Sequence, residues 1–501
     1  MPKTATAESS ATSSILVLGT LICFVLASTP SMAVPSDAGD ANIPTTAEVV
    51  VIGAGASGLR VADRLVSKFG VKDVVVLEAR HRIGGRLLSI EPAHTASSSG
   101  GVTRRLDLGA TWYWPSEQAM VDFLESETTK EVASKPPTVF KQHYEGDAMA
   151  HYFDHSSSIG AQQRSRMDGN PLDMPNTGRV AEGMMSICDI LHSRLPSGIV
   201  QLGSVVTSID AHAEGNRYHI QYTHMPESTS PDKVAGVQRQ ITGDHVVIAL
   251  PPALAVRNIE FSPALPADLQ NAAEHTPVWM GSIVKAVAEY RFPFWRKMKL
   301  SGSASSRVGP LHEVHDMSSD GWTKEAMAAA EAELAEEKKQ KRNQGKRSSV
   351  PSEEDFDRGH SEVLPPILSS AGSDRPFAAL FGFGQPRSPL EVITEEEVVA
   401  QLKFIFGGVD GYHDPIRVTI QDWRQEEFTS FPKAEQLHHR QLFGHSIFYD
   451  RSKDERRAWR ETYWTSTETA VDGGGHIEGA FQAAERTARA IAASRASPHA
   501  M

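Results

Sequence analysis

The chain has 501 residues, of which 40% are hydrophobic and 22% charged, and its formal net charge is -12. This length is more than one hydrophobic core normally serves, so we predict two domains in a globular protein of ordinary composition. The acidic balance excludes nucleic acid as the main partner, because a phosphate backbone is bound by a basic surface.

The N-terminal region carries a candidate targeting signal. Residues 14–27 form an almost purely apolar run, and Ser31-Met32-Ala33 follows with small residues at the positions of a signal-peptidase site. We predict a signal peptide over 1–33 and a linker over 34–46, with secreted, lumenal and plastid destinations all open. The apolar run is shorter than the ~20 residues of a membrane span. We therefore expect no stable span after signal removal, and a retained signal anchor is the alternative.

The folded part begins with a pattern typical of a βαβ unit. Residues 47–53 form a continuous apolar run that stops at glycine, as in a strand buried on both faces of a parallel sheet. An amphipathic helix is expected from Ser57 to about Lys68, followed by a second buried strand over 73–78. Further on we expect strands over 199–210, 244–250 and 282–290, and a long helix over 476–493.

Residues 323–362 differ in composition from the rest of the chain. The stretch 324–341 is rich in Ala, Glu and Lys and predicts a solvated helix, while the residues after it are polar and have little apolar surface to bury. We interpret the block as a charged, low-complexity surface insertion. A regulatory or docking tail is the alternative.

The turn after the first strand, residues 53–58, reads GAGASG. Gly53 permits a tight turn, Gly55 lets the backbone approach a pyrophosphate, and Gly58 lets helix and strand pack closely. The helix N-terminus offers free N–H groups to the anion. Glu78 ends the second strand 20 residues after Gly58, where an acid meets the adenosine ribose. The context predicts a dinucleotide site, and a tight turn without a ligand is the alternative.

The loop after Glu78 favours FAD over a nicotinamide cofactor. It contains Arg80, Arg86 and a glycine pair, which suit a second clamp on the phosphates that a nicotinamide dehydrogenase does not need. The run LDLGATW at 106–112 then brings backbone close to the cofactor.

With these motifs the chain resembles the flavin-containing amine oxidases, a group that includes monoamine oxidases, polyamine oxidases and histone lysine demethylases. The resemblance rests on GAGASG, LEARHRIGGR and LDLGATW and, further on, on IALPPAL, MGSIVKAVAEYRFPFWR and STETAVDGGGHIEGAFQAAERTARAIA. It implies an α/β fold in which a Rossmann-type FAD-binding domain is interleaved with an α+β substrate domain containing a mixed sheet. We expect the FAD-binding domain over 47–122, 178–265 and 440–495, and the substrate domain over 123–177 and 266–439.

The resemblance also implies a set of FAD contacts. The ADP half would lie against the glycine turn and the two arginines, the adenine would meet the backbone of Val206, and the helix beginning near Ile477 would direct its N-terminus at the flavin. In chain order the implied cofactor-binding residues are Gly53, Gly55, Ser57, Gly58, Glu78, Arg80, Arg86, Gly109, Ala110, Thr111, Val206, Thr467, Glu468, His476 and Ile477. Monoamine oxidases bind their flavin covalently through a cysteine. Pro432 takes that cysteine's place here, so we expect non-covalent FAD.

Lys285 is the candidate catalytic residue. It lies in the middle of an apolar strand pattern, where a lysine is rarely buried without a reason. In the family the lysine of this block holds a water at flavin N5, which assists reoxidation by oxygen or hydrolysis of the imine. A desolvated lysine also has a lowered pKa, which suits proton transfer. The alternative is an edge-strand lysine that reaches solvent.

The substrate pocket is expected to include Trp112, Trp423, Lys433 and His476. Two tyrosines usually form an aromatic sandwich around the amine in this family, and Lys433 and His476 fall at their places. A cation at 433 would repel a protonated amine and favour a substrate carboxylate. The alternative is that Lys433 is a solvated loop residue. The histidines at 438, 439 and 445 fit no usual metal motif, and we expect no metal.

The predicted activity is that of an FAD-dependent oxidase. A hydride would pass from the carbon alpha to an amine onto flavin N5, the imine would hydrolyse, and O2 would be reduced to H2O2. The partners are a small-molecule amine or amino acid and O2. An L-amino acid oxidase, a carotenoid-type desaturase or isomerase, and an FAD-binding scaffold without activity are the alternatives.

Overall fold

The computed structural model describes the larger part of the chain after residue 43. The described residues are 44–93, 104–128, 137–142, 145–154, 161–167, 177–211, 217–226, 236–345, 376–386, 388, 390–407, 413–431, 443–450 and 454–496. The predicted signal peptide, most of the linker, Pro432 and Lys433 lie outside these ranges. In the part that is described, no helix has the length and apolar character to cross a membrane.

The first sheet is built around the predicted βαβ unit. Its order is β13-β10-β11-β12-β1-β2-β9, and β19 also pairs with β12. The central strands β1, β2 and β12 are parallel, while β11 pairs in antiparallel fashion with both of its neighbours. The strands are β1 (Thr46–Ile52), β2 (Val74–Leu77), β9 (Val200–Gln201), β10 (Ser204–Asp210), β11 (Tyr218–His224), β12 (Val237–Ile248), β13 (Glu260–Ser262) and β19 (Thr462–Trp464).

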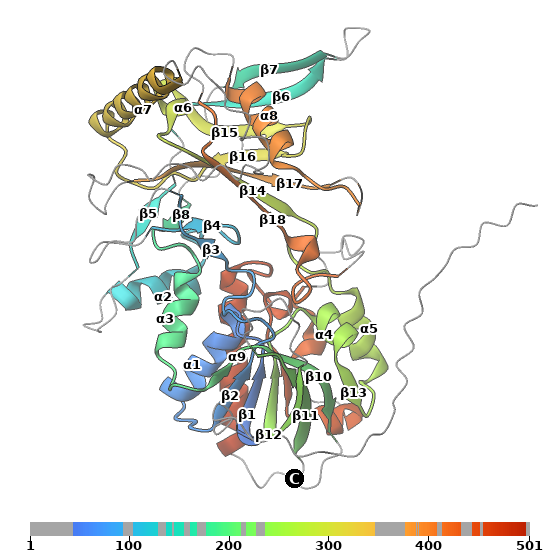
Figure 1. Ribbon diagram of the computed structural model, residues 1–501. Helices are drawn as coiled ribbons and strands as arrows, with labels where there is room; N and C mark the ends of the chain where they lie inside the picture. Colours follow the sequence, from blue (N-terminus) through green and yellow to red (C-terminus); the bar gives the residue numbers. More distant parts are fainter. Residues whose placement is uncertain are drawn as a thin grey trace, which may run out of the picture. The chain divides into compact units, whose positions relative to one another are not determined.

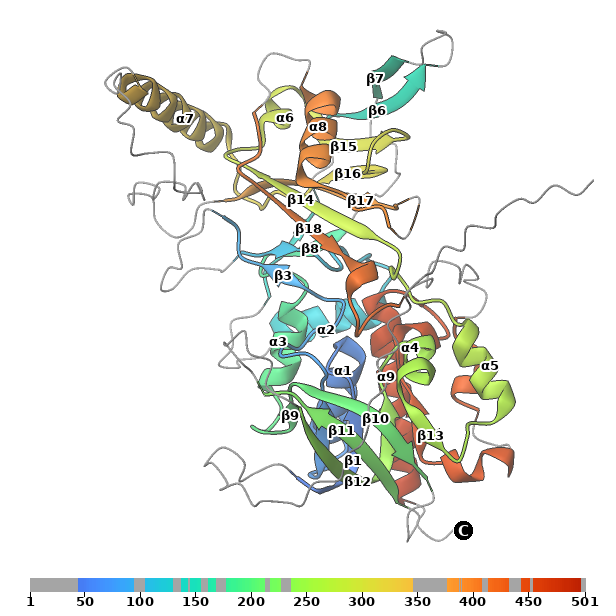
Figure 2. The same cartoon turned by 45° about the vertical axis from the view of Figure 1, so that its right-hand side comes forward.

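Helices from both ends of the chain cover this sheet. Helix α1 (Ala56–Ser67) packs on β1 and β2, and α9 (Ile477–Ala496) packs on α1, as both cartoon views show (Figures 1 and 2). Their buried side chains form one core with the strands, because continuous apolar strands need cover on both faces. The other helices near this sheet are α2 (Gln118–Thr128), α3 (Ser186–Ser193), α4 (Pro252–Asn258) and α5 (Ala267–His275).

The second sheet is mixed and has the order β18-β14-β17-β16-β15-β6-β7. The pair β15 and β6 is parallel, and the other pairs are antiparallel. Its strands are β6 (Asp147–Asp154), β7 (Ala161–Met167), β14 (Val284–Tyr290), β15 (Leu300–Ser306), β16 (Glu313–Asp316), β17 (Ala378–Gly384) and β18 (Arg417–Asp422), and its helices are α6 (Phe294–Lys297), α7 (Lys324–Gly345) and α8 (Glu395–Phe406).

The remaining elements are short. They comprise the two-stranded pairs β3 (Ser89–Ile90) with β4 (Leu106–Asp107) and β5 (Val139–Lys141) with β8 (Gly178–Val180), and the 3-10 turns η1 (Trp423–Gln425), η4 (Ser446–Phe448), η5 (Asp454–Trp459) and η6 (Thr467–Thr469).

Most expected elements are found, with two informative differences. The expected strand 199–210 is broken by a turn at Gly203, whose φ of +66° lies in the left-handed region. Strand β12 begins at Val237, earlier than expected, because its first half, although mostly polar, pairs with β11. The insertion helix α7 is present, and one side of it contacts the second sheet through Ala330 and the Arg291–Glu337 ion pair. The domain boundaries stay a prediction.

Candidate active site

One cavity of about 1070 Å³ is lined by residues from both sheets. Its size is at the upper end for a ligand pocket, as a long cofactor requires. All the predicted cofactor and pocket residues that the structure describes line it, except Gly58 and Glu468. The predicted residues at its walls are Gly53, Gly55, Ser57, Glu78, Arg80, Arg86, Gly109, Ala110, Thr111, Trp112, Val206, Lys285, Trp423, Thr467, His476 and Ile477.

The glycine turn has the shape of an anion cradle. Gly53 has a φ of +103°, and Gly55 forms the N-cap of α1 with no side chain over the free N–H groups. A Cβ at Gly58 would lie 1.9 Å from the carbonyl oxygen of Gly53, so Gly58 serves helix packing and not the cavity wall. Glu78 is held by the backbone N–H groups of Ala54 and Arg80, at 2.7 and 3.0 Å. These features fit the ADP half of a dinucleotide.

The two predicted phosphate arginines are each held by a carboxylate. Arg80 donates to Glu426 at 3.0 Å and to Thr429 at 2.6 Å. Arg86 donates to Glu468 at 2.6 Å. Burial alone would raise the pKa of Glu468, but Arg86 outweighs it and the pKa is lowered. Glu468 therefore holds Arg86, which lines the cavity, while Glu468 itself does not line it.

Lys285 is enclosed in the second sheet beside the cavity. Strand β14 lies between β17 and β18 with all seven residues buried, and the Lys285 side chain is 1% exposed. Its ammonium donates to the carbonyl of Gly109 at 2.8 Å and to the hydroxyl of Thr111 at 2.5 Å, and it lies 4.4 Å from the centre of the Phe381 ring. The alternative of an edge-strand lysine in solvent is wrong.

The environment of Lys285 lowers its affinity for a proton. Burial lowers the pKa of Lys285 to about 7, Asp107 acts in the opposite direction, and Arg179 adds to the lowering. A side chain whose protonation changes near neutral pH is suited to proton transfer.

Trp112 and Trp423 form apolar walls near Lys285, and hydrogen bonds fix both indoles. Trp423 donates to the carbonyl of Leu108 at 3.1 Å. Trp112 donates to Gln142 at 2.9 Å, and Gln142 donates to the backbone carbonyl of Asp316. The two tryptophans are thus held in set orientations.

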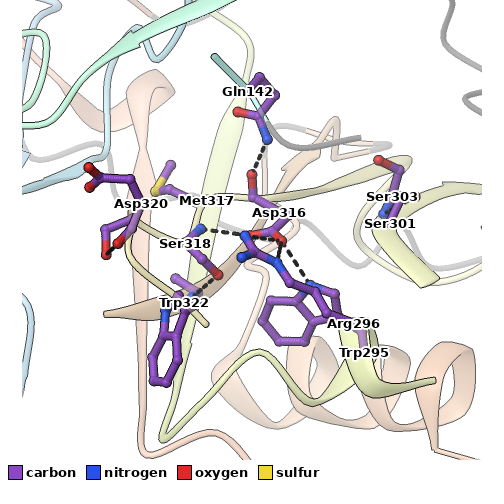
Figure 3. A network of polar contacts seen from close by, with 12 residues as sticks. Gln142, Trp295, Arg296, Ser301, Ser303, Asp316, Met317, Ser318, Asp320 and Trp322 are labelled. Carbon is purple, nitrogen blue, oxygen red and sulfur yellow. Dashed lines mark hydrogen bonds and ion pairs between the residues drawn. The ribbon is translucent and has the colours of Figure 1, made fainter. Parts of the chain in front are cut away.

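Asp316 is the centre of a buried polar network (Figure 3). Its carboxylate accepts from Trp295 Nε1 at 2.9 Å, from Arg296 at 2.9 Å and from the backbone N–H of Ser318 at 2.7 Å. Trp295 is fully buried, as expected for a core residue. The network ties the loop that carries Gln142 to the second sheet, so the orientation of Trp112 depends on this core.

His476 belongs to a cluster that the sequence did not reveal. Its Nδ1 lies 2.6 Å from Glu117, its ring stacks on Trp114 with the centroids 4.9 Å apart, and the Trp279 ring lies 5.9 Å away. The residue that follows begins α9, whose N-terminus faces the cavity at Ile477. Trp114 closes an aromatic run over residues 112–114, whereas Glu117 and Trp279 gave no signal in the sequence. Within the described ranges, no cluster of His, Cys, Asp and Glu could hold a metal ion.

Comparison with known proteins identifies the family. The model of the flavin containing amine oxidoreductases matches residues 140–492, and that of NAD(P)-binding Rossmann-like domains matches residues 51–126. The chain belongs to the flavin containing amine oxidoreductase family. This confirms the resemblance, the α/β fold class and the flavin cofactor.

Individual relatives are distant. A Mycobacterium tuberculosis protein named a flavin-containing monoamine oxidase is 33% identical over 150 residues, so the match spans only 29% of each chain. Amine oxidase B of Canis lupus familiaris is 20% identical across 89% of this chain and 86% of its own length. A solved structure of putrescine oxidase bound to putrescine covers 89% of this chain and 99% of its own, with a TM-score of 0.57 at 17% identity. That likeness concerns the fold.

Proposed function

We propose that the protein is an FAD-dependent oxidase that binds FAD non-covalently, oxidises a small-molecule amine and passes the electrons to O2. The observation that carries the proposal is the convergence of three segments on one cavity: the glycine turn at Gly53, the α9 N-terminus at Ile477, and Lys285. The glycine turn suits the pyrophosphate, and the N-terminus of α9 suits negative charge on the flavin. Lys285 suits proton transfer beside the flavin.

The chemistry divides between the cofactor and the chain. FAD held by the glycine turn and the N-terminus of α9 would supply the hydride acceptor for the oxidation of a neutral amine to an imine and the two electrons that reduce O2 to H2O2. Water would then hydrolyse the imine to a carbonyl compound and ammonia or a smaller amine. Lys285 would hold a water or exchange a proton through its Nζ. Trp112 and Trp423 would exclude bulk water and orient the substrate.

Most of the cationic side chains along the cavity already have carboxylate partners. Three of the four arginines at its walls are held by carboxylates: Arg80 by Glu426, Arg86 by Glu468 and Arg424 by Asp422. Arg257 lies against the Phe431 ring, a contact that leaves its N–H donors available. Recognition of an amino acid's carboxylate needs a cation with donors to spare. Because Arg257 could receive a carboxylate and Lys433 lies outside the described ranges, an L-amino acid oxidase is retained as the second candidate.

A carboxylate on the cavity wall shares a sheet face with Lys285, two strands away. Lys285 and Glu313 both pair with Phe383, on opposite sides of β17, so their side chains lie on the same face of the sheet. Glu313 lines the cavity, and contact with His315, 3.5 Å away, lowers its pKa. A carboxylate held in its charged form suits an alkylammonium substrate.

A peroxide assay across monoamines, polyamines and L-amino acids tests the proposal. The expected result is H2O2 with at least one amine and none with the amino acids. Peroxide with amino acids alone would favour the second candidate, and a flavin-loaded protein that oxidises none of them would be a scaffold. Acid precipitation should release all flavin into the supernatant, since non-covalent binding is expected.

We also propose that residues 1–33 direct the chain into the secretory pathway or an organelle. A fluorescent protein fused behind residues 1–46 should leave the cytosol. Cytosolic fluorescence would contradict the proposal.

A further inference from the structure

Asp107 is a buried carboxylate that the proposed function does not use. It ends β4, and its side chain is 1% exposed. One oxygen accepts from the hydroxyl of Ser89 at 2.6 Å and from the backbone N–H of Met184 at 2.8 Å. The other oxygen is buried without a hydrogen-bond partner in the described structure. A buried carboxylate with an unused acceptor is costly unless a cation compensates it.

Two cations, Lys285 and Arg179, act on Asp107. Of the two, Lys285 is the one that donates to the turn that follows Asp107. Arg179 is committed elsewhere: it donates to the carbonyls of Met317 and Ser318, at 2.8 and 3.0 Å, and stacks on the Phe140 ring. Lys285 donates to Gly109 and Thr111, which follow Asp107 by two and four residues.

Asp107 is the acidic group whose charge acts on Lys285: burial raises the pKa of Asp107, and the charge of Lys285 opposes that rise. Among the described residues, the charges that act on Lys285 are Asp107 on β4, which favours the ammonium, and Arg179 on β8, which opposes it. His315 on β16 also interacts with Lys285, as a second basic group. Asp107 is thus the acidic group in this set.

We propose that Asp107 is a positioning residue for Lys285: its carboxylate, held by Ser89 and Met184, anchors the end of β4 from which the turn with Gly109 and Thr111 continues to the ammonium, and its negative charge favours the protonated form of that ammonium. The inference rests on the proposed function only for the role of Lys285 in turnover. The pairing itself concerns the chain alone.

The pairing is measured directly on the lysine. In the holoenzyme carrying 13Cε-labelled lysine, the Lys285 signal is assigned by its loss in Lys285→Met and titrated by NMR. Asp107→Asn keeps the shape of the side chain and removes its charge, so the midpoint should fall by about one pH unit or more, a tenfold change in proton affinity. The matched control is Asp189→Asn, because Asp189 is a solvent-exposed carboxylate paired with Arg105 and solvent screens it from Lys285. An unchanged midpoint in Asp107→Asn would overturn the proposal.

A second variant decides the case if Asp107→Asn does not fold. In Asp107→Asn/Lys285→Met neither charge is left, so the thermal stability lost in Asp107→Asn should be recovered in part. If the double variant is as unstable as Asp107→Asn, then Asp107 only holds the turn and the charge pairing is refuted.

Turnover gives an independent readout. The pH profile of flavin reoxidation by O2 should move to lower pH in Asp107→Asn, while Asp189→Asn keeps the wild-type profile. A lower NMR midpoint without any amine oxidation would support the pairing and contradict the proposed function. An unmoved midpoint in a protein that oxidises amines would refute the pairing and support the proposed function.

Discussion

Glu117 and His476 lie 359 positions apart in the chain, and their side chains are joined at 2.6 Å between Oε1 and Nδ1. The contact fixes the His476 ring against Trp114 at the N-terminus of α9, on the cavity wall. A histidine held in this way has a set tautomer and orientation, which a substrate or flavin beside it would encounter.

Loss of this contact should impair catalysis more than folding. In Glu117→Gln the charged partner of His476 is gone while the shape of the side chain is kept. A charge-assisted hydrogen bond contributes about 1.5–3 kcal/mol, so we expect about a tenfold or greater loss in the rate of anaerobic flavin reduction by an amine. Stopped-flow absorbance measures it. Gln118→Glu, one residue further on an exposed side of α2, is a control that should keep the wild-type rate, and a wild-type rate in Glu117→Gln would remove the contact from the mechanism.

Two glycines of the turn have different roles: Gly58 allows the helix to pack closely on the strand, and Gly55 leaves room for the cofactor. A Cβ at Gly55 would meet no protein atom closer than 4.0 Å, whereas a Cβ at Gly58 would lie 1.9 Å from the Gly53 carbonyl oxygen. We expect Gly55→Ala to keep the melting temperature of the flavin-free protein and to weaken FAD binding tenfold or more. Gly58→Ala should lower both. Fluorescence titration with FAD and thermal unfolding measure the two effects, and equal effects of both substitutions on both quantities would contradict this division.

Glu313→Gln tests the preference for cationic substrates. The substitution removes a carboxylate that His315 keeps charged on the cavity wall near Lys285. We expect the KM for protonated amines to rise about tenfold, as for the loss of one charged partner, with a smaller effect on kcat. Steady-state peroxide formation measures both constants. If KM is unchanged while kcat falls, Glu313 acts in the chemical step and not in substrate recognition.

A pH-dependent clamp joins α1 to α9. Arg64 and Lys68 hold Glu485 at 2.7 and 2.9 Å. Burial would raise the pKa of Glu485, but the hydrogen bonds of Arg64 and Lys68 outweigh it and lower the pKa to about 2. Because the folded state has the lower pKa, the stabilisation is present above the unfolded value of 4.5 and is lost as pH falls from 4.5 towards about 2.

The substitution Glu485→Gln should therefore destabilise the fold in a pH-dependent way. We expect a loss of about 1 kcal/mol in the free energy of unfolding at pH 7, because the partners are partly exposed, and a shrinking difference from wild type below pH 4.5. Urea unfolding between pH 3 and 7 measures it, with Glu260→Gln on β13 as the control. A difference that stays constant down to the acid end would show that the charge of Glu485 is not its cause.

The sequence predicted the parts of the site that depend on local pattern. Continuous apolar strands, the glycine turn and the apolar neighbours of Lys285 each leave a short-range signal, and the structure has the corresponding elements. Contacts between distant segments leave none. Glu117 meets His476, and Gln142 meets Asp316, because the fold brings together residues that no spacing in the chain relates. The same holds for Lys285 and the carbonyl of Gly109, which the fold joins at 2.8 Å across 176 positions of the chain.

Anaerobic mixing of the purified, FAD-loaded protein with a panel of amines tests the central claim most directly. The account predicts that at least one amine bleaches the oxidised flavin absorbance and that readmitted O2 restores it with release of H2O2. A colourless protein that takes up no FAD, or a bound flavin that no amine reduces, would contradict it.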